Sequence, residues 1–316
     1  MRIFANLEFD QEQRERLTAG TVGDEVYFGD PERFTAQDKH AFVLSEVAFG
    51  WCPPELLALA GQLRWFQLDS VGYEQYSSLD WEVLARTLIV TNLRGFFSVP
   101  VAETAIAGVL ALYRGIDRLI DLKPNQTWRP LEMRSQLRTL EGTAALLVGY
   151  GAIGRALAQR LHAFQCAFRT FGRNAHSADF STLAELDENL PDADIVFLSL
   201  PHTPETIGMF DRRRLGLLRQ GAVLVNVGRG SVLDELALAD ALKAGRIMGA
   251  VIDVTQAEPL PRGHVFWTIP NLLLTQHTGG GFAAELDRKI DLFLDNLHRY
   301  RESVALENVV NLRADS

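Results

Sequence analysis

A glycine-rich turn near the middle of the chain constrains the fold more than any other feature. Residues 149–154 read Gly-Tyr-Gly-Ala-Ile-Gly and directly follow the apolar run 144–148. Apolar residues then recur at helical spacing, at Ile153, Leu157, Leu161 and Phe164. A short buried strand, three spaced glycines and a helix, in this order, are typical of the turn that opens a dinucleotide-binding fold.

Each glycine has a separate physical task in such a turn. Gly149 permits the tight bend, Gly151 lets the backbone approach a pyrophosphate, and Gly154 lets the helix pack closely on its strand. The helix begins at Ala152 and Ile153, where unpaired N–H groups and the positive end of the helix dipole favour a phosphate. We therefore predict that these five residues contact a dinucleotide cofactor. A turn with a purely structural role is the alternative.

The position of the turn implies a second domain. A dinucleotide-binding fold begins at its first strand, so the roughly 140 residues before the turn are expected to fold separately. The chain has 316 residues, of which 47% are hydrophobic and 22% charged. This length and composition are ordinary for a globular protein with two cores.

The composition also argues against several classes of protein. A net charge of -9 disfavours a surface for nucleic acid or for an anionic membrane. Cys52 and Cys166 are the only cysteines, and the sequence contains neither a disulfide framework nor a metal-ligand cluster. Acidic residues within 8–15 interrupt any signal-peptide core, and no apolar run is long enough to span a bilayer. We expect a cytoplasmic protein that binds no metal, nucleic acid or membrane.

The part before the glycine turn predicts a small α/β unit. Apolar runs that indicate strands cover 2–7, 41–44, 65–68 and 88–91, and helices are expected at 11–18 and 55–60. Residues 101–113 are apolar nearly all round and rich in small residues, which is typical of a helix buried at a domain or subunit interface. Residues 123–138 are polar and contain two prolines, so we expect an extended arm there.

Strand and helix signals alternate regularly after the glycine turn. Further strands are expected at 167–171, 195–200, 222–227, 249–254 and 272–275. This alternation predicts a parallel, doubly wound sheet. Because ligands bind at the carboxyl ends of the strands in such sheets, the residues that follow each run are candidates for function.

Three of these strand ends carry side chains suited to catalysis. Arg229 follows one strand, Glu258 follows the next, and His277 follows the last. An arginine can bind a carboxylate through two hydrogen bonds and polarise a neighbouring carbonyl. A histidine can pass a proton to that carbonyl oxygen while a glutamate holds its ring. Taken singly, each residue has an ordinary alternative: a loop-fixing arginine, a helix-start carboxylate, and a core or surface histidine.

These residues resemble the D-isomer-specific 2-hydroxyacid dehydrogenase family, in particular its glyoxylate and hydroxypyruvate reductases. The likeness covers nearly the whole chain, with matching segments at 99–104, 140–142 and the glycine turn, 200–203, 225–230, 253–259 and 275–280. It implies that Arg229 binds the substrate's carboxyl and carbonyl groups, and that Glu258 pairs with His277, the general acid and base. It also implies that Val71 and Gly72 offer backbone N–H groups to the substrate carboxylate.

The same resemblance implies an architecture and a set of cofactor contacts. The fold would be α/β, with two Rossmann-like domains, each a doubly wound parallel sheet, and the active site in the cleft between them. A flavodoxin-like substrate-binding domain would comprise 1–98 and 287–316, and the dinucleotide-binding domain 99–286. Besides the glycine turn, the expected cofactor contacts are Thr104, Arg173, Asn174, Pro201, Val227, Gly228, Arg229, Asp253, His277 and Gly279.

The chain departs from the family pattern at three places. An NAD-selective site carries Asp or Glu about 20 residues after the glycine turn. Here Gly172, Arg173 and Asn174 follow the strand, without a carboxylate. Arg173 and Asn174 could bind a 2′-phosphate, so we predict a preference for NADP(H), with NAD(H) second; a solvated Arg173 beside a non-selective pocket is the alternative. Gln276 replaces a common proline before His277, and Tyr73-Glu74 replaces a smaller apolar residue and Asp.

Together these features predict hydride transfer between NADP(H) and a small 2-oxo acid, most simply the reduction of glyoxylate or hydroxypyruvate to a D-2-hydroxy acid. Two other classes stay open: a non-catalytic nucleotide-sensing protein, like corepressors that resemble this family, and a dehydrogenase of another small anion such as a phosphonate. Substrate choice is expected to depend on side chains such as Trp51, Tyr73, Arg94 and Trp267. We also expect a homodimer formed through the Val101–Tyr113 region.

Overall fold

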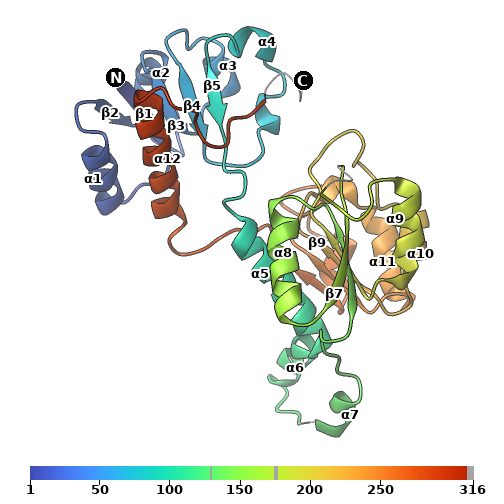
Figure 1. Cartoon of the computed structure of the whole chain (residues 1–316). Coiled ribbons are helices and arrows are strands. Elements are labelled where there is room, and N and C mark those ends of the chain that lie inside the picture. The colour runs from blue at the N-terminus through green and yellow to red at the C-terminus, as the bar shows by residue number, and fades with distance from the viewer. Residues whose placement is uncertain (129, 174–176, 312–316) are drawn as a thin grey trace. The chain divides into compact units, whose positions relative to one another are not determined.

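The computed structural model describes residues 1–128, 130–173 and 177–311. The chain divides into two compact units: unit 1 is Met1–Phe96 with Phe282–Ser316, and unit 2 is Phe97–Gly281 (Figure 1). The sequence placed these junctions after residues 98 and 286. The C-terminal segment therefore belongs to the unit with which the chain begins.

Unit 1 is built on a five-stranded parallel sheet. Its strands lie in the order β2-β1-β3-β4-β5, which is the flavodoxin-like order. The strands are β1 (Arg2–Asn6), β2 (Glu25–Phe28), β3 (Val47–Gly50), β4 (Trp65–Leu68) and β5 (Ile89–Thr91). The helices are α1 (Gln11–Gly20), α2 (Ala36–Val43), α3 (Pro54–Leu57), α4 (Trp81–Leu84) and α12 (Glu285–Arg301), with a 3-10 turn η1 (Glu74–Tyr76).

Two hydrophobic clusters cover the two faces of this sheet. Trp65 and Phe66 are neighbours in β4 and enter opposite clusters, as the two-residue period of a strand requires. Trp65 stacks on Phe293 of α12, with ring centroids 5.1 Å apart. The return of the chain thus covers one sheet face of unit 1 with α12.

One expectation for unit 1 was wrong, and two of its strands were missed. Residues 41–44, predicted as a strand, lie at the end of α2, whereas β2 and β3 were not predicted. The helix is fixed by a capping box, in which the hydroxyl of Thr35 accepts the N–H of Asp38 and the Asp38 carboxylate accepts the N–H of Thr35. The apolar run is the buried side of that helix, where Phe42 is fully buried. In contrast, β2 is a partly exposed edge strand without a long apolar run.

Unit 2 is built on a six-stranded parallel sheet, as predicted. Its order is β11-β10-β9-β8-β6-β7, and the order reverses between β6 and β8. The strands are β6 (Ala144–Val148), β7 (Ala167–Phe171), β8 (Ile195–Leu198), β9 (Val223–Asn226), β10 (Gly249–Ile252) and β11 (Leu272–Leu274). A single parallel bridge between Phe171 and Phe180 lies on the outer side of β7. The doubly wound sheet predicted from the alternation is therefore confirmed.

Helices cover both faces of this second sheet (Figure 1). One face packs on α5 (Ser98–Tyr113) and α8 (Ala152–Ala163), and the other on α9 (Leu183–Asn189), α10 (Arg212–Leu217) and α11 (Glu235–Lys243). Short 3-10 turns are η2 (Leu190–Asp192), η3 (Gly230–Val232) and η4 (Val265–Thr268). The Gly108 backbone in α5 lies so close to Val251 of β10 that a β-carbon would come within 2.6 Å of it. The small residues of α5 thus serve packing inside unit 2.

The segment between α5 and β6 differs from the extended arm predicted for 123–138. It contains α6 (Ile116–Leu122) before that range and the short helix α7 (Pro130–Arg134) within it. Apolar side chains of this segment are exposed, including Ile120 at 63%, Trp128 at 89% and Leu131 at 82%. In the part of the chain that the structure describes, no single helix is long and apolar enough to cross a bilayer; α5 and α6 reach that length only as a pair bent by 64°.

Candidate functional site

The glycine turn lies at the point where the strand order of unit 2 reverses. Gly149 has a φ of 104°, in the left-handed region, and a β-carbon there would lie 2.8 Å from the carbonyl oxygen of Ser199, after β8. The Ser199 hydroxyl donates to the Gly149 carbonyl at 2.8 Å. A β-carbon on Gly154 would come within 2.3 Å of the same Gly149 carbonyl. Both glycines are therefore required by close backbone approach, between β6 and β8 and between α8 and its strand.

The start of α8 offers a cradle for an anion. Gly151 is the N-cap of α8, and no side chain caps that end. A β-carbon on Gly151 would meet nothing within 4 Å, so the backbone faces open space there. Ala152 and Ile153 follow as the first helical residues, half-buried. Uncapped N–H groups beside open space at the reversal point fit the pyrophosphate of a dinucleotide.

The strand end that would meet the adenosine carries no carboxylate of its own. Strand β7 ends at Phe171, and Arg173 is exposed two residues later. Asn174, the second residue predicted to contact a 2′-phosphate, lies outside the described residues. The nearby loop after β8 contains Glu205, whose pKa is lowered first by the Thr203 hydroxyl and, to a smaller extent, by Arg173. Arg173 is therefore in the electrostatic field of one carboxylate from another loop.

The loops after β8 and β9 touch through their backbones. A β-carbon on Gly228 would lie 2.6 Å from the carbonyl oxygen of Leu200, directly before Pro201. Val227 is buried, and Pro201 is exposed. The contact places the predicted residues Pro201, Val227 and Gly228 along one stretch of the sheet edge.

A buried asparagine shapes the loop that carries Arg229. Asn226 has no exposed surface; its Nδ2 donates to the Arg229 carbonyl at 3.1 Å, and its Oδ1 accepts the Gly228 N–H at 3.2 Å. The half-buried Arg229 side chain donates to the Gly228 carbonyl at 2.9 Å. Sequence reasoning assigned no role to Asn226, although its place in the Asn-Val-Gly-Arg-Gly segment was a signal. A fully buried polar side chain at a strand end is there to satisfy a loop.

The Arg229 loop lies directly against the loop of Glu258. At Gly230, the residue after Arg229, a β-carbon would come within 2.0 Å of the Thr255 carbonyl carbon. Strands β9, β10 and β11 are adjacent and parallel, so their carboxyl ends lie at one edge. The structure thus gathers the three predicted catalytic residues on neighbouring loops of unit 2.

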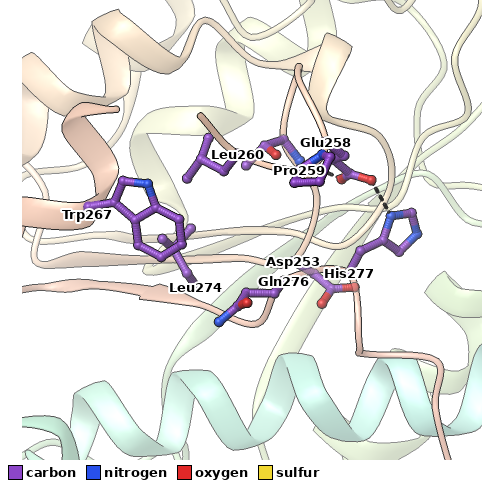
Figure 2. Close-up of a pocket in the computed structure, with 9 residues that line it drawn as sticks. Asp253, Glu258, Pro259, Leu260, Trp267, Leu274, Gln276 and His277 are labelled. Carbon is purple, nitrogen blue, oxygen red and sulfur yellow. Dashed lines mark hydrogen bonds and ion pairs between the residues drawn. The ribbon is translucent and has the colours of Figure 1, made fainter. Parts of the chain in front are cut away.

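Glu258 and His277 form the direct contact of the site. His277 Nδ1 lies 2.6 Å from Glu258 Oε2, and Glu258 Oε1 accepts the Thr255 N–H at 2.9 Å (Figure 2). Gln276 and His277 both have left-handed backbones, with φ of 53° and 57°. Proline cannot adopt such a φ, so this loop conformation requires a residue other than proline at position 276. Because Nδ1 is engaged by the carboxylate, Nε2 is the ring nitrogen left for a substrate.

Asp253 ties the His277 loop to the end of β10. Its backbone carbonyl accepts the His277 N–H at 2.6 Å, and its buried carboxylate accepts the Gly279 N–H at 3.1 Å. A β-carbon on Gly279 would lie 2.7 Å from that carboxylate, which explains the glycine. Thr104 of α5 donates to the Gly279 carbonyl at 3.3 Å. Three residues predicted to contact the cofactor, Thr104, Asp253 and Gly279, are therefore mutually connected.

A cavity of about 490 Å³ opens beside this pair in unit 2. Its lining is polar near Glu258 and His277 and apolar farther away: Asp253, Thr255, Glu258, Pro259, Leu260, Trp267, Leu274, Gln276 and His277. In Figure 2 the Trp267 indole lies at the far end of the cavity from His277. Trp267 was predicted to influence substrate choice, whereas Leu260 and Leu274 were not identified. Leu274 belongs to an apolar run that reads as ordinary core, and Leu260 lies between two prolines in a loop.

Val71 and Gly72 lie in unit 1, in the loop after β4. The Ser70 hydroxyl donates to the Gly72 carbonyl at 2.6 Å, and Asn92 Nδ2 donates to the Val71 carbonyl at 2.8 Å. Val71 is 37% exposed. The loop is therefore held by its carbonyl groups. Within the described ranges 1–128, 130–173 and 177–311, no three His, Cys, Asp or Glu side chains are grouped so as to hold a metal ion.

Comparisons with known proteins show which family the chain resembles. The sequence profile of the D-isomer specific 2-hydroxyacid dehydrogenase NAD binding domain matches residues 106–279. The chain is 31% identical over 274 residues to the glyoxylate reductase of Thermococcus litoralis, covering 81% of this chain and 80% of that protein. It is 30% identical over 242 residues to glyoxylate/hydroxypyruvate reductase A of Serratia proteamaculans, covering 74% and 76%.

Two further similarities widen the range of chemistry. The mitochondrial formate dehydrogenase of Solanum tuberosum is 34% identical over 204 residues, which cover 62% of this chain and 53% of that protein. The chain thus spans about half the length of that relative. Among solved structures, a D-isomer specific 2-hydroxyacid dehydrogenase from Xanthobacter autotrophicus in complex with NADPH superposes with a TM-score of 0.80. The identity is 25%, and the match covers 100% of this chain and 99% of that one.

Proposed function

The chain belongs to the D-isomer specific 2-hydroxyacid dehydrogenase family, and from this premise we propose that it reduces a small 2-oxo acid with NADPH. Glyoxylate and hydroxypyruvate are the proposed substrates, and the product is the D-2-hydroxy acid. The observation that carries the proposal is the Glu258–His277 hydrogen bond of 2.6 Å, held at the same sheet edge as the Arg229 loop. The activities of the Thermococcus glyoxylate reductase and the Serratia glyoxylate/hydroxypyruvate reductase support the substrate class.

The residues of unit 2 fit the cofactor in three parts. The N-terminus of α8 would hold the pyrophosphate, and the loops at Pro201 and Val227–Gly228 would lie along the dinucleotide. Asp253, Thr104 and Gly279 would contact the nicotinamide end. The exposed Arg173, two residues after β7, favours a 2′-phosphate, although the Asp179 carboxylate binds Thr170 near the end of that strand. The Xanthobacter structure with NADPH supports this choice.

The proposed mechanism assigns one task to each residue of the edge. Bound NADPH supplies a hydride to the carbonyl carbon of the substrate. Arg229 binds the substrate carboxylate through its planar guanidinium and so fixes the carbonyl in the plane of attack. His277 donates a proton from Nε2 to the carbonyl oxygen, and Glu258 holds the ring through Nδ1 while that proton is given up. Backbone N–H groups of Val71 and Gly72 are further proposed donors to the substrate carboxylate.

A substrate panel tests the activity and the cofactor choice together. Oxidation of NADPH and NADH is followed by absorbance with glyoxylate, hydroxypyruvate and longer 2-oxo acids, and reduction of NAD+ with formate. We expect turnover with a small 2-oxo acid and a higher kcat/KM for NADPH. Turnover of formate but of no 2-oxo acid would overturn the proposal, and so would the absence of turnover with every compound of the panel. In the second case, tight cofactor binding would favour a nucleotide-sensing protein.

Arg173 allows a sharper test of the 2′-phosphate contact. Loss of one charged hydrogen bond to a phosphate costs about 1.5–3 kcal/mol, so Arg173→Ala should raise the KM for NADPH at least about tenfold and leave that for NADH unchanged. Arg169→Ala is the matched control, since Arg169 lies on the same strand and its guanidinium is over the Phe180 ring. Equal effects of the two variants, or a wild-type preference for NADH, would refute the assignment.

We also propose a homodimer, the assembly expected from residues 101–113. The α5 face is largely covered within unit 2, but the segment of α6 and α7 exposes Ile120, Trp128 and Leu131. Exposed apolar residues of this density are typical of an interface. Light scattering of the wild type and of Ile120→Glu would show a dimer and its loss; a monomeric wild type would refute the proposal. The cytoplasmic location stays a prediction.

A further inference from the structure

A second glutamate–histidine pair lies next to the first one in unit 2. Glu235, the first residue of α11, is only 7% exposed, and its Oε2 lies 3.3 Å from Nε2 of His264. His264 precedes η4, where its Nδ1 accepts the N–H of Phe266 at 3.4 Å. Because Nδ1 acts as an acceptor, Nε2 carries the hydrogen and faces the Glu235 carboxylate.

The two pairs hold consecutive peptide groups of one loop. Oε1 of Glu235 accepts the Gln256 N–H at 2.7 Å, and Oε1 of Glu258 accepts the preceding N–H, that of Thr255, at 2.9 Å. The Gln256 side chain also donates to the Leu233 carbonyl at 2.6 Å, just before α11. In the loop that carries Glu258, the N–H groups of two consecutive residues are therefore each bound by a carboxylate.

We propose that Glu235 and His264 are positioning residues, which fix the Thr255–Gln256 segment and through it the Glu258–His277 pair. The inference rests on the proposed function. Glu258 is itself 37% exposed in its side chain and lies on a loop, so its place depends on the backbone beneath it. Glu235 is buried; its Oε1 accepts a hydrogen bond from the loop, and its Oε2 lies 3.3 Å from Nε2 of His264. A buried carboxylate is held in place because loss of a polar partner would leave it desolvated and unpaired, which is energetically costly.

The geometry predicts a specific pattern among variants. In Glu235→Gln the amide can still accept from Gln256, but its NH2 group faces the Nε2–H of His264, so two donors oppose each other. We expect kcat to fall about tenfold, with cofactor affinity unchanged. His264→Gln should cause a similar loss. In the double variant an amide N–H again faces an amide oxygen. The kcat of the double variant should therefore be no lower than that of the less active single variant.

A control and a second readout separate positioning from general destabilisation. Asp187→Asn, which removes the partner of Arg214 elsewhere in unit 2, should lower the melting temperature without changing kcat. Imidazole 15N spectra, assigned with a His277→Gln variant, should show a changed His277 signal in Glu235→Gln and not in Asp187→Asn. This spectrum needs no turnover, so an inactive wild type would refute the proposed function without deciding this one.

Three results would overturn the inference. They are wild-type kcat in both single variants, a double variant whose loss is the product of the two single losses, and a His277 signal that is the same in Glu235→Gln as in the wild type. If Asp187→Asn lowers kcat as much as Glu235→Gln, the effect is one of stability and the inference also fails.

Discussion

Replacement of Glu258 by Gln tests the catalytic pair most directly. The amide oxygen can still accept the Thr255 N–H, so the loop keeps its support, while the carboxylate opposite His277 Nδ1 is lost. A hydrogen bond to a charged group contributes about 1.5–3 kcal/mol. The side chains of His277 and Glu258 are 54% and 37% exposed, so solvent screening favours the lower end of that range. Since 1.36 kcal/mol corresponds to a factor of ten in rate, we expect kcat to fall about tenfold.

The assay is the steady-state reduction of the best 2-oxo acid from the panel, with cofactor affinity measured by fluorescence titration. Glu258→Ala should cost more than Glu258→Gln, because it also leaves the Thr255 N–H without its acceptor. Cofactor affinity should stay the same in both variants. Glu307→Gln, which breaks an exposed ion pair with Arg299 in unit 1, is the control and should keep wild-type kcat. Wild-type turnover in both Glu258 variants would show that the pair takes no part in proton transfer.

Three further predictions concern the fold. Gly154→Ala places a carbon within 2.3 Å of the Gly149 carbonyl, so it should weaken cofactor binding and lower stability; calorimetric binding equal to wild type would contradict the packing argument. Burial would raise the pKa of Asp38, but hydrogen bonds from Thr35 outweigh burial and lower the pKa. The ionised Asp38 carboxylate therefore stabilises the fold at pH values above the ordinary pKa of the unfolded carboxyl, and this stabilisation is lost as the pH falls. Asp38→Asn should therefore destabilise at pH 7 by about 1–2 kcal/mol in urea unfolding, and the difference should shrink towards acidic pH; a gap that stays constant would refute it. Burial raises the pKa of the Cys52 thiol to about 12, so native protein should not be alkylated there at pH 8. Mass spectrometry should find the alkyl group on Cys52 only when the protein is unfolded before labelling.

The sequence predicted unit 2 well because its strands are buried on both faces. Val223–Asn226 and Ile195–Leu198 are fully buried, and such continuous apolar runs are visible without any tertiary information. Unit 1 was predicted less well: the buried strand Val47–Gly50 was missed, because its apolar run is only three residues long and ends in glycine. The edge strand Glu25–Phe28 has no continuous apolar run, and the short run at 41–44 is the buried side of a helix set by Thr35. Local apolarity alone does not distinguish a short strand from a helix face.

The candidate site divides in the same way. Arg229, Glu258 and His277 could be identified because strand ends in a parallel sheet share one edge. Asn226 and Glu235 were missed, since their roles consist of hydrogen bonds to backbone groups that only the folded loops bring near. For Glu235 the sequence offered no signal that separates it from polar residues at the surface, whereas Asn226 was marked by its place in the Asn-Val-Gly-Arg-Gly segment.

This division suggests how substrate range and catalysis are separated in unit 2. Asn226, Glu235 and Asp253 are at most 7% exposed, and each forms hydrogen bonds with backbone groups of the loops that carry the candidate site residues. A change there would leave buried polar groups unpaired and would cost stability and geometry together. The wall of the cavity is different: Trp267 is 48% exposed, and its indole N–H bonds only the Pro261 carbonyl among the contacts described. Substitution of Trp267 can therefore reshape the cavity while the buried layer keeps His277 and Glu258 in place, so specificity can vary without loss of the catalytic pair.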